Sequence, residues 1–134
     1  MKARGIMIAG TAALAACSVL GMALAAAQAS SASTPTWTQQ HPATSPLTRS
    51  FAVMADDAAT GTVVLFGGAS NSGSGQNLGD TWTWNGTTWT KHSPAAHLSA
   101  RFDAVMANDA ATGTVILFGG SGSQGPLADT WTWG

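Results

Sequence analysis

Hydrophobic and polar residues recur along the chain in two nearly identical blocks. Residues 52–68 read AVMADDAATGTVVLFGG and residues 104–120 read AVMANDAATGTVILFGG, so 15 of 17 positions are identical. The exceptions are Asp56 against Asn108 and Val64 against Ile116. A direct repeat of this kind predicts two copies of one supersecondary unit, each of which buries its apolar surface against its neighbour.

Each block predicts two strands joined by a turn. The first strand is expected at about residues 50–55. The second, TVVLF at residues 62–66, is β-branched and apolar on both faces, which is typical of a strand that is covered on both sides. Asp and Gly between the strands, at residues 56–61, are the residue types that such a turn needs.

Two consecutive glycines end the second strand in each block. They are Gly67, Gly68, Gly119 and Gly120. Such a pair predicts a sharp bend or the close approach of another backbone, because a Cβ atom would obstruct both. Polar, Gly-rich loops follow at residues 69–79 and 121–128, and their different lengths mark a surface that tolerates insertions.

The segment DTWTWNGTTWT at residues 80–90 predicts a β-hairpin. Asn85-Gly86 favours a two-residue type I′ turn, which would pair Trp82 with Trp89 and place Trp84 on the same face. Each indole buries about 200 Å² in a core. We therefore expect these tryptophans to pack between the two units.

The pentapeptide DTWTW returns at the end of the chain, so the second unit has a third strand but ends one strand short of the first. The repeated residues are Asp80, Trp82 and Trp84 in the first unit and Asp129, Trp131 and Trp133 in the second. Trp37-Thr38 has the same two residues, in the same order, as Trp89-Thr90, and lies 52 residues earlier. We predict that it supplies the missing strand beside residues 129–133.

The first 29 residues read as an export signal. Lys2 and Arg4 precede an apolar run over residues 6–27, and Ala29 ends a small-residue cleavage site. We therefore expect a signal helix at 1–29, a flexible lead-in at 30–36 and a secreted domain at 37–134.

Two alternatives for this segment stay open. The apolar run is long enough to be kept as a membrane anchor. Leu14-Ala15-Ala16-Cys17 resembles a bacterial lipobox, in which case Cys17 would carry a lipid and hold the protein at a membrane.

Composition narrows the function classes. After residue 29 the chain has three basic side chains against six aspartates, so no basic patch is available for nucleic acid. The single cysteine, Cys17, lies in the export segment. The expected domain therefore has no disulfide and depends on packing and strand pairing.

The repeat resembles the Kelch motif. The features that carry the resemblance are Gly-Gly after the second strand, Asp-Thr-Trp at the start of the third and Trp on the fourth, within about 50 residues. The likeness covers residues 37–134 and is nearest to secreted bacterial Kelch proteins and the propeller of galactose oxidase-like proteins. It implies an all-β fold in which each repeat is a four-stranded antiparallel blade of a β-propeller. The chain departs from the motif in having Trp82, Trp84 and Trp133 where Tyr is common.

Two blades make an incomplete propeller, since propellers have about 4–8 blades. Either the chain is part of a longer propeller protein, or copies of it assemble into a ring, with three copies supplying six blades.

The candidate binding face gathers residues before the first strands and in the loops. It comprises Arg49, Arg101, His92, His97, Asn71, Gln76 and Gln124. For Arg49 and Arg101 a structural role is the alternative, in which each guanidinium donates hydrogen bonds to carbonyls of the neighbouring blade.

We expect no catalytic, cofactor or metal site. The histidines do not repeat in register, and no metal-ligand spacing joins them with a carboxylate. Asp80 and Asp129 are expected to accept backbone N–H bonds from the preceding loop, because repeat-equivalent aspartates would lie on different blades and could not form an acid/base pair.

These patterns predict a non-catalytic extracellular binding or scaffold module that contacts a protein or glycan through loops 69–79, 91–100 and 121–128. The alternative is a part of a secreted galactose oxidase-like enzyme. That resemblance implies a copper site built from Tyr and His with a Tyr–Cys crosslink. Because the chain has no Tyr and its one Cys is Cys17, such an active site would lie outside this chain.

Overall fold

The computed structural model of the chain describes residues 34–70 and 75–134. Its contacts divide the chain into Met1–Thr36 and Trp37–Gly134. The signal helix expected at 1–29 and the lipid attachment site at Cys17 lie outside the described residues. Within the described ranges there is no helix that is long and apolar enough to cross a membrane.

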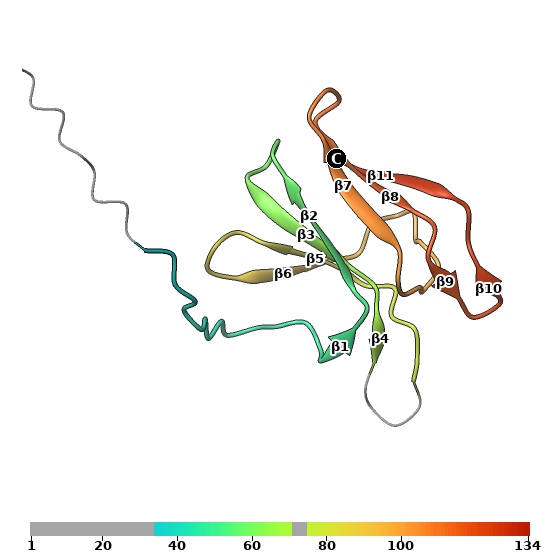
Figure 1. The fold of residues 1–134 in the computed structure, drawn as a ribbon, viewed down its shortest axis with the longest axis horizontal. Coiled ribbons are helices and arrows are strands. Elements are labelled where there is room, and N and C mark those ends of the chain that lie inside the picture. The colour runs from blue at the N-terminus through green and yellow to red at the C-terminus, as the bar shows by residue number, and fades with distance from the viewer. Residues whose placement is uncertain (1–33, 71–74) are drawn as a thin grey trace, which may run out of the picture. The chain divides into compact units, whose positions relative to one another are not determined.

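Short antiparallel strands make up the described part of Trp37–Gly134 (Figure 1), which confirms the prediction of an all-β, antiparallel fold. In chain order they are β1 (Arg49–Ser50), β2 (Val53–Asp57), β3 (Thr62–Phe66), β4 (Ala69–Ser70), β5 (Thr81–Trp84), β6 (Trp89–His92), β7 (Val105–Asp109), β8 (Thr114–Phe118), β9 (Ser121–Gly122), β10 (Gly125–Pro126) and β11 (Thr130–Trp133).

Each repeat contributes one main sheet. The first sheet has four strands in the order β2-β3-β5-β6, and the second has three in the order β11-β8-β7. Two-stranded pairs, β1 with β4 and β9 with β10, lie beside them and were not predicted from the sequence. The second strand of the first repeat, β3, has the bounds expected from the TVVLF pattern.

The strand predicted at Trp37-Thr38 is absent. These residues are outside any strand, Trp37 is fully exposed at 103%, and in the described part of the chain β11 pairs with β8 alone. A match of two residues offers little apolar burial to offset the entropy of ordering the connection that follows it. The second sheet therefore has three strands instead of the four of a whole unit.

The hairpin of β5 and β6 has a different register from the one predicted. Trp84 pairs with Trp89 and Trp82 with Lys91, so the turn centres on Gly86-Thr87 instead of Asn85-Gly86. The cause is the Asn85 side chain, whose Oδ1 accepts bonds from the backbone N–H groups of Thr87 and Thr88 at 3.0 and 2.9 Å. A shift of two residues keeps each side chain on its face, so the three tryptophans still share one side of the sheet.

The two main sheets pack face to face. We call the face of each sheet that contacts the other sheet its inner face, and the opposite face its outer face. Phe66 of the first sheet and Leu117 of the second are 2% and 3% exposed and share one apolar cluster with Ala104, Met106 and Trp131. Strand β2 contacts β7 and β8, and β2 and β7 lie side by side in Figure 1. The core of the described chain therefore lies between the repeats, as the sequence repeat predicts.

The tryptophans divide between the two sides of this core. Trp131 and Trp133 share the inner face of the second sheet with Leu117 and Val115, which they oppose in register. The prediction that Trp82, Trp84 and Trp89 pack between the units is wrong. These residues lie with Leu65 on the opposite, outer face of the first sheet, because the inner face there carries Phe66 and its cross-strand partner Thr81.

The glycine pairs mark a close approach of the two repeats, as predicted. Gly67 and Gly68 have φ values of +64° and +104°. A Cβ atom on Gly67 would collide with the carbonyl oxygen of Arg101, and one on Gly68 would lie 2.8 Å from the carbonyl oxygen of Ser50. The Gly68 N–H donates to the Arg101 carbonyl at 2.8 Å, so the missing side chains allow a backbone bond between repeats.

A second backbone hydrogen bond between the repeats joins two residues that both have an unusual backbone conformation. Phe51 and Asp103 occupy equivalent positions, and both have φ of +57°, in the left-handed region that non-glycine residues rarely adopt. The Asp103 N–H donates to the Phe51 carbonyl at 3.0 Å. The aromatic rings of Phe51 and Phe102 meet at the same junction, with centroids 6.1 Å apart.

Candidate functional site

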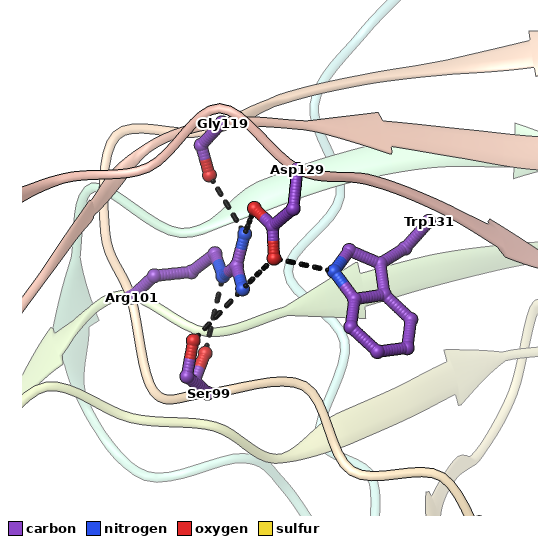
Figure 2. A network of polar contacts seen from close by, with 5 residues as sticks. All are labelled: Ser99, Arg101, Gly119, Asp129 and Trp131. Atoms are coloured by element: carbon purple, nitrogen blue, oxygen red, sulfur yellow. Dashed lines mark hydrogen bonds and ion pairs between the residues drawn. The ribbon is translucent and has the colours of Figure 1, made fainter.

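In each repeat a buried arginine binds the aspartate that precedes the third main strand. Arg101 is 1% exposed and pairs through both terminal nitrogens with Asp129, at 2.5 and 2.9 Å. Asp129 Oδ2 also accepts a bond from Trp131 Nε1 at 2.6 Å. Figure 2 shows this network, in which Arg101 also donates to the Gly119 carbonyl at 3.0 Å.

The first repeat builds the same network from equivalent residues. Arg49 pairs with Asp80 at 2.7 and 3.0 Å and donates to the Gly67 carbonyl at 3.0 Å. Trp82 Nε1 donates to Asp80 at 2.7 Å. Because both repeats form this Arg–Asp–Trp network, the network follows from the repeated sequence.

The aspartates of both networks are held ionised. Burial raises the pKa of the Asp80 carboxyl, but the bonds from Arg49 and Trp82 outweigh it and hold this pKa below its usual value of 3.8. Bonds from Arg101 and Trp131 likewise hold the pKa of Asp129 well below that value. The side chain of Asp80 is 17% exposed and that of Asp129 is 40% exposed, so water screens the second pair more strongly.

These networks correct two expectations. Each arginine donates to a carbonyl of its own repeat, at Gly67 or Gly119, and not to the neighbouring one. The aspartates accept from arginine and tryptophan side chains instead of from backbone N–H groups of the preceding loop. Both guanidinium groups are buried and paired, so Arg49 and Arg101 do not belong to an exposed binding face.

A groove lies where three loops meet. Its volume is about 640 Å³, and it is lined by parts of the loops expected at 69–79, 91–100 and 121–128. The lining residues are Gly75, Gln76, Asn77, Ser99, Ala100, Gly122, Ser123, Gln124 and Leu127. The structure therefore brings together Gln76 and Gln124 of the predicted binding face, while Asn71 lies outside the described residues.

The arginine network supports one wall of this groove. Arg101 Nε donates to the Ser99 carbonyl at 3.1 Å, and another nitrogen of the same guanidinium contacts Ser99 Oγ at 2.8 Å (Figure 2). The position of Ser99 is thus coupled to a buried ion pair. Such support limits the movement of a loop that would otherwise be held by few contacts.

The groove offers neutral hydrogen-bonding groups. Its described lining has the amides of Gln76, Asn77 and Gln124 and the hydroxyls of Ser99 and Ser123, and it includes no Asp, Glu, Lys, Arg or His. Amides and hydroxyls both donate and accept hydrogen bonds. This chemistry suits an uncharged polar ligand better than an anion or a cation.

The two histidines of the predicted binding face lie elsewhere. His92 and His97 line a second hollow, together with Lys91 and Asp80. His92 Nε2 is 2.8 Å from Thr83 Oγ1, and its ring packs edge-on against Trp133 at 5.1 Å. His92 therefore takes part in packing between the repeats. Among the described residues no three His, Cys, Asp or Glu side chains are grouped closely enough to hold a metal ion.

The arginine–aspartate pairing was missed because the partners are far apart in sequence. Arg49 and Asp80 are separated by 31 positions and Arg101 and Asp129 by 28. The usable signal was that each copy carries one Arg before its first strand and one Asp before its third. A buried cation requires a partner, so these two repeated charges were the natural pair.

The fold and the site define a class of protein, which is an all-β chain of antiparallel sheets with a groove lined by loops. No family model matches the chain, and no curated protein sequence matches it. Among solved structures 40 chains match, and one of them is the structure of YjhT. Its similarity has a TM-score of 0.56 at 16% identity and covers 71% of this chain and 30% of YjhT. The chain thus spans less than a third of YjhT, and the likeness concerns the fold alone.

Proposed function

We propose that residues 37–134 are two neighbouring blades of a Kelch-type β-propeller and act as a non-catalytic extracellular module that binds a glycan or a protein. The observation that carries the binding proposal is the groove between the three loops. The blade proposal is supported by the stacking of two repeated antiparallel sheets and by the resemblance of the sequence to the Kelch motif. Secretion is proposed from the sequence of residues 1–29, with a lipid at Cys17 as the alternative.

The chemistry of the groove favours a neutral, hydroxyl-rich ligand such as a glycan. Sugar hydroxyls both donate and accept hydrogen bonds, as do the amides of Gln76 and Gln124 that line the groove. A protein ligand would use the same groups for its backbone amides. An acidic or basic ligand would find no opposite charge among the described lining residues.

The test is binding of the chain to an array of neutral oligosaccharides, followed by titration calorimetry on the best ligand. The double variant Gln76→Ala/Gln124→Ala should lose about 5- to 150-fold in affinity, since each lost hydrogen bond contributes about 0.5–1.5 kcal/mol. Gln39→Ala, at an exposed glutamine outside the groove, is the matched control and should bind normally. Unchanged binding by the double variant refutes the groove assignment, and a blank array refutes a glycan ligand.

A further inference from the structure

The outer face of the second sheet is apolar and uncovered in the described structure. Register and strand alternation place Val105, Ala107, Ile116 and Phe118 together on this face, with Thr130 and Thr132 of β11 beside them. Val105 is 64% exposed and Phe118 is 49% exposed. Phe66, the equivalent of Phe118 in the first repeat, is only 2% exposed because the second sheet covers it.

The backbone groups that hydrogen-bond the first repeat to the second have equivalents in the second repeat. Between the repeats, the Gly68 N–H donates to the Arg101 carbonyl, and the Arg101 N–H donates to the Leu78 carbonyl at 3.1 Å. The equivalent groups of the second repeat are the N–H of Gly120 and the carbonyl of Leu127. In the described part of the chain no hydrogen bond engages either group. The second repeat thus presents the same donor and acceptor that the first repeat uses to hold its neighbour.

The equivalent surface is present on the first repeat, where Met54 is 50% exposed while Leu65 and Trp82 are each 7% exposed. The inner face of the second sheet, which packs on the first sheet, carries Met106, Asn108, Val115, Leu117, Trp131 and Trp133. The equivalent residues on the outer face of the first sheet are Met54, Asp56, Val63, Leu65, Trp82 and Trp84. The two sets are identical except that Asp56 stands in place of Asn108.

We infer that the outer face of the second sheet binds the outer face of the first sheet of another copy of this chain, head to tail. The contact would repeat the packing already present between the two repeats within one chain, with Arg49 of the second copy in the place of Arg101. Such a contact is heterologous, so it adds copies in one direction until a ring closes. This inference goes beyond the proposed ligand binding and does not depend on it.

One residue limits the strength of this contact. Asn108 Oδ1 is buried between the repeats and has no hydrogen-bond partner among the described residues. In the contact between copies, Asp56 would bring a carboxylate into this position. Burying a charge without a partner is more costly than burying an amide. The contact between copies is therefore expected to be weaker than the contact within the chain, and Asp56→Asn should strengthen it.

Sedimentation velocity of the full chain over a range of concentrations tests this inference. The expected result is an average mass that rises with concentration, with at least about tenfold tighter association for Asp56→Asn. Phe118→Glu, or Val105→Glu as a second variant of the same face, should be monomeric. Met54→Glu, at a residue 50% exposed on the other face, should be monomeric as well. Ala96→Glu, at an exposed position of the connection between the repeats, should associate as the unmodified chain does.

Mixing the two monomeric variants provides the decisive measurement. Phe118→Glu copies keep an intact first sheet and Met54→Glu copies keep an intact second sheet, so an equimolar mixture should form dimers and stop there. A mixture that stays monomeric would overturn the inference. A monomeric Asp56→Asn chain, or association that survives Phe118→Glu and Met54→Glu, would do so too. None of these substitutions touches the groove, so loss of ligand binding and loss of association are separable.

Discussion

Asp80→Asn should destabilise the chain strongly. Asp80 accepts two bonds from Arg49 and one from Trp82 Nε1. The substitution removes the charge and one acceptor oxygen while it keeps the side-chain shape. Because the side chain of Arg49 is only 6% exposed, water cannot fully replace the lost carboxylate.

The expected size follows from the burial of the pair. Removing one partner of a fully buried ion pair costs about 3–5 kcal/mol. Asp80 keeps 17% exposure and the asparagine keeps one acceptor, so we expect a loss of about 2–3 kcal/mol in the free energy of unfolding at pH 7. For a domain of about 100 residues this corresponds to a decrease in Tm of about 10–20 °C.

Urea unfolding followed by tryptophan fluorescence measures this loss. The pKa of Asp80 is lowered in the folded chain, so its contribution is present above the unfolded pKa and is lost as the pH falls through the folded pKa. The difference between the unmodified chain and the variant should therefore narrow below about pH 4. Asp103→Asn, at an exposed aspartate, is the control and should change stability by less than about 0.5 kcal/mol. If Asp80→Asn unfolds like this control at pH 7, the buried-pair reasoning is refuted.

Three further outcomes are expected. Gly67→Ala should lower the free energy of unfolding by more than about 2 kcal/mol, because its Cβ would collide with a carbonyl of the second repeat. Gly61→Ala, with φ of +68° and open space around it, should lower the free energy of unfolding by about 1 kcal/mol. Equal losses in urea unfolding would argue against the close approach at Gly67. Leu117→Ala, in the core between the sheets, should lower the free energy of unfolding by about 2–5 kcal/mol, and Leu47→Ala, at an exposed residue, should lower it by less than about 0.5 kcal/mol. Equal losses for the two variants would contradict the assigned core. Trp37→Phe should remove the emission most accessible to acrylamide, and unchanged quenching would show that this indole is covered.

Hydrophobic patterning and the internal repeat predicted much of the fold. The TVVLF strand, the close approach at Gly67 and the packing of one repeat on the other all follow from where apolar residues and glycines recur. These features depend on local composition and periodicity. The same reasoning identified the three loops that line the groove, because loop length and polarity are also local properties.

Features that depend on particular side-chain bonds were not accessible in this way. The hairpin register depends on Asn85 Oδ1 accepting bonds from Thr87 and Thr88, which competes with the turn type that the Asn-Gly pair favours. The placement of the tryptophans required knowing which face of the first sheet meets the second. Alternation shows that Trp82 and Trp84 share a face but not which side the neighbouring repeat covers.

The left-handed backbone shared by Phe51 and Asp103 bears on how the repeats tolerate sequence change. An aspartate adopts this conformation readily, but a phenylalanine does so at an energetic disadvantage. That both residues adopt it indicates that the junction imposes the shape and the side chain only accommodates it. Divergence at such a position can then alter the chemistry of the surface without moving the strands on either side. The junction is therefore a natural place to introduce new residues, such as a label or a reactive group, into a duplicated scaffold.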